Sequence, residues 1–326
     1  MMKKLLAALL LLPAFCLGFS KAQAADYKQE YKLSVVPGAT SGWGQSASHF
    51  ADLVREKSNG RINIKVYPSA QLLAGKQTSE FPMLRNGAID FAMASTINWS
   101  PQIKELNRPA LPFFLAVQPD RYKAMDAILS GKSGQMMRDA VEDKGVKIIG
   151  WAENGFRELG ANPMNINWSE ATTGFQQGLV DGQENPTNGI NIPLKIWDFH
   201  KHHSDWHYII DPLLLGVNPD VWKSFSEEDQ KLLLEAAAET EKYSKAISRV
   251  GLDNGEALEY LKSVGKTPEI TEPYAFMEQQ GMVVTRPTPE QIQQFHDATA
   301  KTRADWTQKI GPDLVKAAEE DMAQVK

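Results

Sequence analysis

The chain has 326 residues, of which 42% are hydrophobic and 23% are charged, and its formal net charge is −5. A mildly acidic chain without a run of basic residues does not favour nucleic-acid binding. About 300 residues remain once an N-terminal leader is set aside, which is more than one core usually supports. We therefore expect two domains and no nucleic-acid partner.

The first 24 residues are typical of a secretory signal peptide. Lys3 and Lys4 precede an apolar stretch over residues 5–19, and Ala22-Gln23-Ala24 is a cleavage site of the small-residue type. The stretch is shorter than the roughly 20 residues that cross a bilayer. We expect cleavage after Ala24 and a soluble, periplasmic, monomeric protein.

The only cysteine, Cys16, raises the alternative of a lipid-anchored start. Phe15 before it is bulky where lipid attachment requires a small residue, which favours simple cleavage. The mature chain then has a net charge of −8, because three lysines leave with residues 1–24. It also has no cysteine, so disulfides and thiolate metal sites do not contribute to its stability.

The first third of the mature chain alternates between strand and helix patterns. Strands are predicted at 31–36, 61–67 and 89–94, and helices at about 43–58 and 77–86. This rhythm is typical of a parallel, doubly wound sheet. Pro82 falls inside the second predicted helix, where proline costs about 3 kcal/mol.

A second α/β unit is predicted to begin with the strand 146–151, after a helical segment over 120–144. Further helices are predicted from Ser226 to about 249, over 254–262, and from Thr288, where Pro289 takes the first helical position. Since no flexible linker separates the units, we expect α/β class with two doubly wound domains and an interdomain cleft, as in periplasmic binding proteins.

No phosphate-binding, dinucleotide-binding or zinc-protease motif is present in the sequence. The spacing of four neighbouring histidines is irregular, so we expect neither a metal site nor a cofactor; they are His200, His202, His203 and His207. Three carboxylates could form an acid and base pair and leave a secreted hydrolase as an alternative; they are Glu153, Asp181 and Glu184.

Two residues of the second unit have both a structural and a binding interpretation. Arg157 follows a predicted central strand, where its guanidinium could grip a carboxylate, or it could be a surface arginine paired with Glu158. Trp168 precedes the helix cap Ser169 and could line a pocket or belong to the core. The pattern leaves both choices open.

Several segments together resemble the solute-binding proteins of TRAP (tripartite ATP-independent periplasmic) transporters, the DctP family. The matching segments are residues 34–43, 60–68, 84–90, 111–114, 150–157 and 180–186. The resemblance implies two α/β domains that close over a small organic acid and deliver it to the small and large membrane subunits of the transporter.

The resemblance also implies a set of ligand-binding residues. Arg157 matches the family's first ligand-facing arginine, Asn185 a ligand-binding asparagine, and Trp168 an aromatic residue against the ligand. Other matching positions, with more variable side chains, are Gln77, Ser95 to Asn98, Trp206 and His207. The implied domains are 25–153 with about 212–254, and 154–211 with about 255–326.

One departure from the family pattern lies after Leu159, which joins directly to Gly160. About thirty residues, roughly one strand-helix unit, are absent there, together with the arginine that makes the family's main carboxylate contact. In addition, Arg108 and Pro109 stand where apolar residues are expected. A degenerate relative with lost or altered binding is therefore an alternative, and we expect the second domain to be the less stable.

Overall fold

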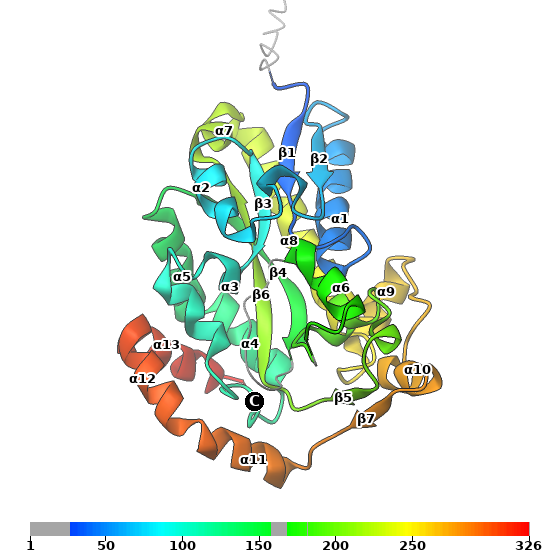
Figure 1. Cartoon of the computed structure of the whole chain (residues 1–326). Helices are drawn as coiled ribbons and strands as arrows, with labels where there is room; N and C mark the ends of the chain where they lie inside the picture. The colour runs from blue at the N-terminus through cyan, green and yellow to red at the C-terminus, as the bar shows by residue number, and fades with distance from the viewer. Residues whose placement is uncertain (1–26, 158–167, 181, 326) are drawn as a thin grey trace, which may run out of the picture.

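The structure is a computed structural model that describes residues 27–157, 168–180 and 182–325 (Figure 1). The predicted signal peptide with Cys16, the junction after Leu159 and Asp181 lie outside these residues. Of Arg157 and Trp168, only the backbone is described.

A five-stranded sheet in the order β2-β1-β3-β6-β4 is the centre of the fold. β1 pairs in parallel with β2 and β3, which confirms the predicted βαβ arrangement. β6 runs antiparallel to both β3 and β4, so the whole sheet is mixed rather than parallel. The strands are β1 (Tyr31–Ser34), β2 (Ile64–Tyr67), β3 (Phe91–Ser95), β4 (Lys147–Arg157) and β6 (Ile209–Val217).

β4 corrects two expectations. The segment 146–151 does not open a separate sheet, because β6 pairs β4 with β3 and so adds it to the first sheet. Among the described residues β4 also pairs only with β6, so it is an edge strand rather than a central one. Arg157 is its last residue instead of following it.

The predicted helices form close to their expected bounds. The long helix after Ser226 ends at Arg249 as predicted, and Thr288 makes a capping box with Gln291. The helices are α1 (Gly42–Lys57), α2 (Glu80–Arg85), α3 (Thr96–Trp99), α4 (Arg121–Ser130), α5 (Lys132–Glu142), α6 (Trp168–Gln176), α7 (Pro219–Ser224), α8 (Glu227–Arg249), α9 (Glu256–Ser263), α10 (Pro273–Gln279), α11 (Pro289–Ala298), α12 (Ala300–Ile310) and α13 (Pro312–Met322). Short 3₁₀ helices span Gln71–Leu73, Gln77–Ser79, Lys104–Ala110 and Ile196–Asp198, and a π-helix spans Thr187–Asn191.

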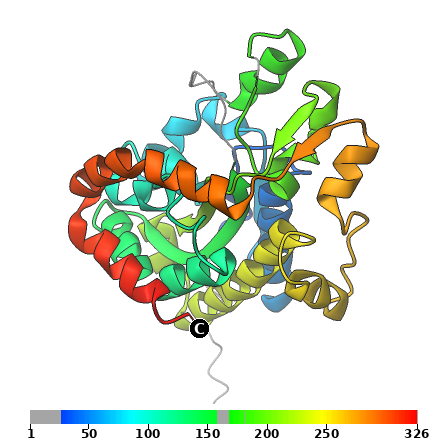
Figure 2. The ribbon, with the colours of Figure 1, turned by 90° about the horizontal axis from the view of Figure 1, so that it is seen from below.

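Helices cover both faces of the sheet, because successive strand residues point to opposite sides. On one face Met93 and Leu213 pack against α1 and α8. On the other face Ala94 and Leu214 pack against α4, α5 and α13. Figure 2 shows α11, α12 and α13 running one after another around one side of the molecule.

A second, smaller sheet pairs β5 (His202–Ser204) in parallel with β7 (Val283–Thr285) beside α10 (Figure 1). It lies in the predicted second domain. The predicted boundaries after residues 153 and 211 fall inside β4 and β6, two strands that run from one predicted domain into the other. The division into domains stays a prediction.

Pro82 does not carry the expected cost. α2 begins at Glu80, so Pro82 is its third residue, and the first four N–H groups of a helix have no intrahelical acceptor. The preceding segment Gln77–Ser79 forms a 3₁₀ helix instead of a longer α-helix. Proline is therefore compatible with this position.

Arg108 is fully buried between the Lys104–Ala110 helix and its neighbours. Its guanidinium lies 4.6 Å over the Phe114 ring, and its nitrogens find no hydrogen-bond partner in the described parts of the chain. Burial lowers the pKa of Arg108 to about 9, against the opposing charges of Asp321 and Glu319. Position 108 therefore holds a desolvated cation in a place where a hydrophobic side chain would fit.

Arg108→Met is expected to raise the free energy of unfolding by about 1 to 3 kcal/mol, because it removes a buried charge without hydrogen bonds in the described residues and keeps most of the packing volume. Urea denaturation followed by circular dichroism measures the change. Arg85→Met, at an exposed arginine of α2, is the control and should leave the value within about 0.5 kcal/mol. An unchanged or lower stability of Arg108→Met would show that the cation is compensated.

Candidate functional site

Ser95 lies at the point where β3 ends and α3 begins, and Asp211 of β6 holds it. The Ser95 hydroxyl donates to Asp211 Oδ1 at 2.7 Å and accepts the N–H of Ile97 at 3.2 Å. Asn154 of β4 donates from Nδ2 to Asp211 Oδ2 at 3.0 Å. Because β6 lies between β3 and β4, one buried carboxylate fixes a polar side chain on each neighbouring strand.

These groups lie toward the carboxyl ends of β3 and β4. β6 runs antiparallel to its neighbours, so its first residues lie beside the ends of β3 and β4. Ser95 is in register with Leu213, and Arg157 with Ile209. Ligands of α/β sheets usually bind outside the carboxyl ends of the strands, and these residues are found at those ends.

Asn185 belongs to a ring of amide groups. Asn185 Nδ2 donates to Gln183 Oε1 at 2.7 Å, and Gln183 Nε2 donates to Asn191 Oδ1 at 2.7 Å. Asn191 Nδ2 then donates to the Asn185 carbonyl at 3.0 Å. The ring ties the segment before the π-helix to the end of that helix, and so fixes the half-buried Asn185 side chain.

Gln77 and Asn98 lie in two elements that contact each other. Gln77 opens the 3₁₀ helix Gln77–Ser79, which contacts α3, the helix that carries Asn98. Both side chains are half-buried. The fold therefore brings two of the predicted positions from the first domain into neighbouring elements.

His207 and Trp206 are engaged within the protein. His207 Nε2 lies 2.9 Å from Arg121 Nη2 and 3.0 Å from Asp205 Oδ2. Burial would raise the pKa of Asp205, but the bond with His207 and the nearby Arg121 charge hold that pKa below its usual value. The Trp206 ring packs edge-on against Phe295, with centroids 5.2 Å apart. Their role in ligand binding stays a prediction.

Among the described residues no group of histidine, cysteine, aspartate or glutamate side chains is arranged to hold a metal ion. Glu184, one of the three predicted carboxylates, lies near Tyr208. Burial and the Glu184 charge raise the pKa of Tyr208 to about 12. The phenol is therefore neutral at physiological pH and able to donate a hydrogen bond.

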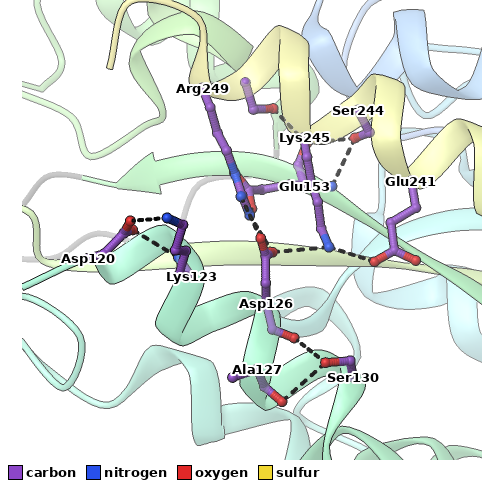
Figure 3. A network of polar contacts seen from close by, with 11 residues as sticks. Asp120, Lys123, Asp126, Ala127, Ser130, Glu153, Glu241, Ser244, Lys245 and Arg249 are labelled. Carbon is purple, nitrogen blue, oxygen red and sulfur yellow. Dashed lines mark hydrogen bonds and ion pairs between the residues drawn. The ribbon is translucent and has the colours of Figure 1, made fainter. Parts of the chain in front are cut away.

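A buried ion-pair network, which sequence reasoning missed, surrounds Glu153 (Figure 3). Arg249 Nε and Nη2 donate to the two oxygens of Glu153 at 2.9 and 2.5 Å. The Glu153 side chain is completely buried and Arg249 is 9% exposed. Since both Glu153 oxygens accept bonds from Arg249, this carboxylate is not free to act as the acid or base of a hydrolase.

The sequence profile described as bacterial extracellular solute-binding protein, family 7 (DctP), matches residues 33–159 and 156–309. The two matches meet at the position where the family segment is expected to be absent. The C4-dicarboxylate-binding periplasmic protein DctP of Rhodobacter capsulatus is 24% identical, over 86% of this chain and 84% of its own length. The 2,3-diketo-L-gulonate-binding periplasmic protein of Escherichia coli is 25% identical, over 68% of this chain and 74% of its own length.

Among solved structures, a TRAP periplasmic solute-binding protein from Ralstonia eutropha H16, with bound (S)-2-acetolactate, is 36% identical with a TM-score of 0.80. That likeness covers 91% of this chain and 100% of the other. A protein of the same class from Polaromonas, bound to D-erythronate, has a TM-score of 0.74 at 21% identity over 90% and 98% of the two chains. The chain belongs to family 7 of the bacterial extracellular solute-binding proteins, the DctP family of TRAP transport, and it is a binding protein rather than an enzyme.

Proposed function

We propose that this protein captures a small carboxylate with a short, oxygen-substituted carbon chain and delivers it to the membrane subunits of a TRAP transporter. The observation that carries the proposal is the likeness, at 36% identity, to a protein solved with (S)-2-acetolactate. The polar groups that Asp211 and the amide ring fix are suited to hydroxyl and keto oxygens, which need donors as well as acceptors.

Arg157 is the proposed carboxylate anchor, with Asn185, Ser95 and Trp168 beside the ligand. Arg157 is the last residue of β4, so its backbone lies at the carboxyl ends of the strands, where Ser95 and Asn154 are fixed. A guanidinium can bind a carboxylate through two parallel hydrogen bonds. Gln77, Asn98, Trp206 and His207 complete the proposed set.

Arg157→Ala should weaken binding of (S)-2-acetolactate by about 2 to 5 kcal/mol if the charge pair is buried, because the ligand carboxylate would lose its partner. Isothermal titration calorimetry measures the change. Arg55→Ala is the control, since Arg55 is an exposed arginine of α1 paired with Asp52. Equal affinity of the wild type and Arg157→Ala would show that Arg157 is a surface arginine without a role in binding.

We further propose that the segment absent after Leu159 lowers both the stability of the second domain and the affinity for acids. Two charge-assisted contacts to one carboxylate, each worth roughly 1.5 to 3 kcal/mol, would be reduced to one. Restoring the missing strand and helix from a relative that has them should raise the melting temperature and the affinity. If the natural chain already melts as cooperatively as the restored variant and binds acids as tightly, the fold has rearranged to compensate for the absent segment, and this hypothesis is wrong.

We infer that the protein is exported, is cleaved after Ala24 and acts in the periplasm as a monomer. None of the helices in the described ranges is long and apolar enough to cross a membrane. Mass spectrometry of the exported protein should find a mature chain that starts at Ala25. An uncleaved start, or a lipid on Cys16, would contradict this inference.

A further inference from the structure

Arg249 is the last residue of the 23-residue helix α8, and it holds that helix to β4. Besides its two bonds to Glu153, it donates from Nη1 and Nη2 to the two oxygens of Asp126 on α4, at 2.8 and 2.7 Å. Lys245, one turn earlier on α8, lies 3.0 Å from Asp126 Oδ1 (Figure 3). Three elements therefore meet at one guanidinium.

The backbone of β4 is tied to α8 at the same residue. The Glu153 N–H donates to the Ser244 hydroxyl at 2.9 Å, and the hydroxyls of Ser244 and Ser248 donate to the Glu153 carbonyl at 3.0 and 2.8 Å. These bonds are all buried. Glu153 is thus fixed to α8 through its main chain as well as through its side chain.

Two residues beyond each partner of the ion pair, the chain has a glycine with positive φ. Gly155 has a φ of +110°, and the β4–β6 register shifts between Glu153 and Gly155. Gly251 has a φ of +71°, and a β-carbon there would lie 2.2 Å from the Thr271 carbonyl oxygen. Glycine adopts such conformations without the steric cost of other residues, and backbone changes at a few such positions are how hinges move.

We propose that the Glu153–Arg249 pair is the fixed pivot for closure of the two predicted domains, with the rotation taken up at Gly155 and Gly251. The proposal rests on the proposed function and on predicted boundaries that follow residue 153 and lie near residue 254. Arg249 is then a positioning residue: it determines how the two halves of the site meet and does not contact the ligand. A bidentate guanidinium suits this role, because its planar fork fixes orientation as well as distance.

Arg249→Lys tests the pivot, because lysine keeps the charge and loses the fork. Arg61→Lys is the matched control: Arg61 also binds a buried carboxylate of α8, Asp229 at 2.7 Å, but in the first turn of that helix. The mature chain has no cysteine, so Glu56→Cys on α1 and Gln279→Cys on α10 allow a spin label on each side of the boundary. Double electron–electron resonance then measures the distance between them, with and without (S)-2-acetolactate.

We expect Arg249→Lys to broaden the distance distribution in both states and to raise the dissociation constant about tenfold, as for a binding-competent fraction reduced to about one tenth. Arg61→Lys should lower the melting temperature without changing either quantity. If both variants keep the wild-type distribution and affinity, or both change them equally, the network is structural only and the proposal is wrong.

One further variant and the distance distributions measured without ligand keep the outcomes distinct. If Arg249→Lys does not fold, the double variant Glu153→Leu with Arg249→Met removes the pair without leaving a buried charge, and it should show the same broadening; a wild-type distribution in that variant would overturn the pivot. If the wild type binds no acid, the proposed function fails, while the distributions measured without ligand still decide the pivot.

Discussion

Arg249→Met is expected to lower the free energy of unfolding by about 3 to 5 kcal/mol, the usual cost of removing one partner from a buried ion pair. Glu153 is completely buried, and Arg249 is its only charged partner among the described residues. The variant would leave that carboxylate without its counter-charge, and Asp126 would lose two hydrogen bonds. Urea denaturation followed by circular dichroism measures the loss.

The double variant Glu153→Leu with Arg249→Met separates the cost of an unpaired charge from the value of the pair. Replacing both charges with hydrophobic residues is often neutral or stabilising, so most of the loss should be recovered. Arg55→Met, which breaks an exposed pair with Asp52, should cost less than about 1 kcal/mol. A loss of that small size for Arg249→Met would mean that water reaches Glu153.

Glu80→Gln is expected to make the protein increasingly more stable than the wild type as the pH rises from 5 to 8. Burial raises the pKa of Glu80 to about 8, although hydrogen bonds from Ser34 and Trp99 oppose the shift. The Ser34 hydroxyl lies 2.7 Å from Oε1, and Trp99 Nε1 lies 3.3 Å from Oε2. No cation is among the causes of the shift.

The direction of this change in stability follows from the pKa values of Glu80 in the folded and unfolded states. The folded state holds the proton up to about pH 8, whereas the unfolded chain releases it near pH 4.5. The stability that the neutral acid contributes is therefore complete below the unfolded pKa and is lost as the pH rises toward the folded one. At about 1.4 kcal/mol per pH unit, the difference from the non-titrating glutamine should reach the order of 4 kcal/mol by pH 8.

Urea denaturation of both proteins at pH 5, 6, 7 and 8 measures this divergence. Glu259→Gln, at a carboxylate of α9 outside the main core, is the matched control and should follow the wild-type curve. Parallel curves for the wild type and Glu80→Gln would show that Glu80 is ionised in the folded protein.

Local patterns were enough to predict much of the fold. The alternation of residues 31–36 and 61–67 indicates β1 and β2, and the Thr288 cap with Pro289 fixes the start of α11. The strand β6 was missed. All nine of its residues are buried, so it has no polar alternation, and Pro212 in its middle argues against a strand.

The site was predictable only where a family pattern marks it. Ser95 and Asn185 come from the resemblance, and the structure shows how each is held. Asp211 and Arg249 carry no local signal, because their partners Ser95 and Glu153 lie 116 and 96 residues away. Contacts of that separation depend on which strands and helices become neighbours, and the order β3-β6-β4 was not predicted.

Capture of a small organic acid is the central claim, and calorimetric titration of the wild-type mature chain tests it most directly. The ligand is (S)-2-acetolactate, and the control is acetoin, which has the same carbon skeleton without the carboxylate. We predict saturable binding of one acetolactate per chain and no measurable binding of acetoin, because a charge-assisted contact to the carboxylate anchors the ligand. Equal binding of both compounds, or heat from neither, would contradict the account.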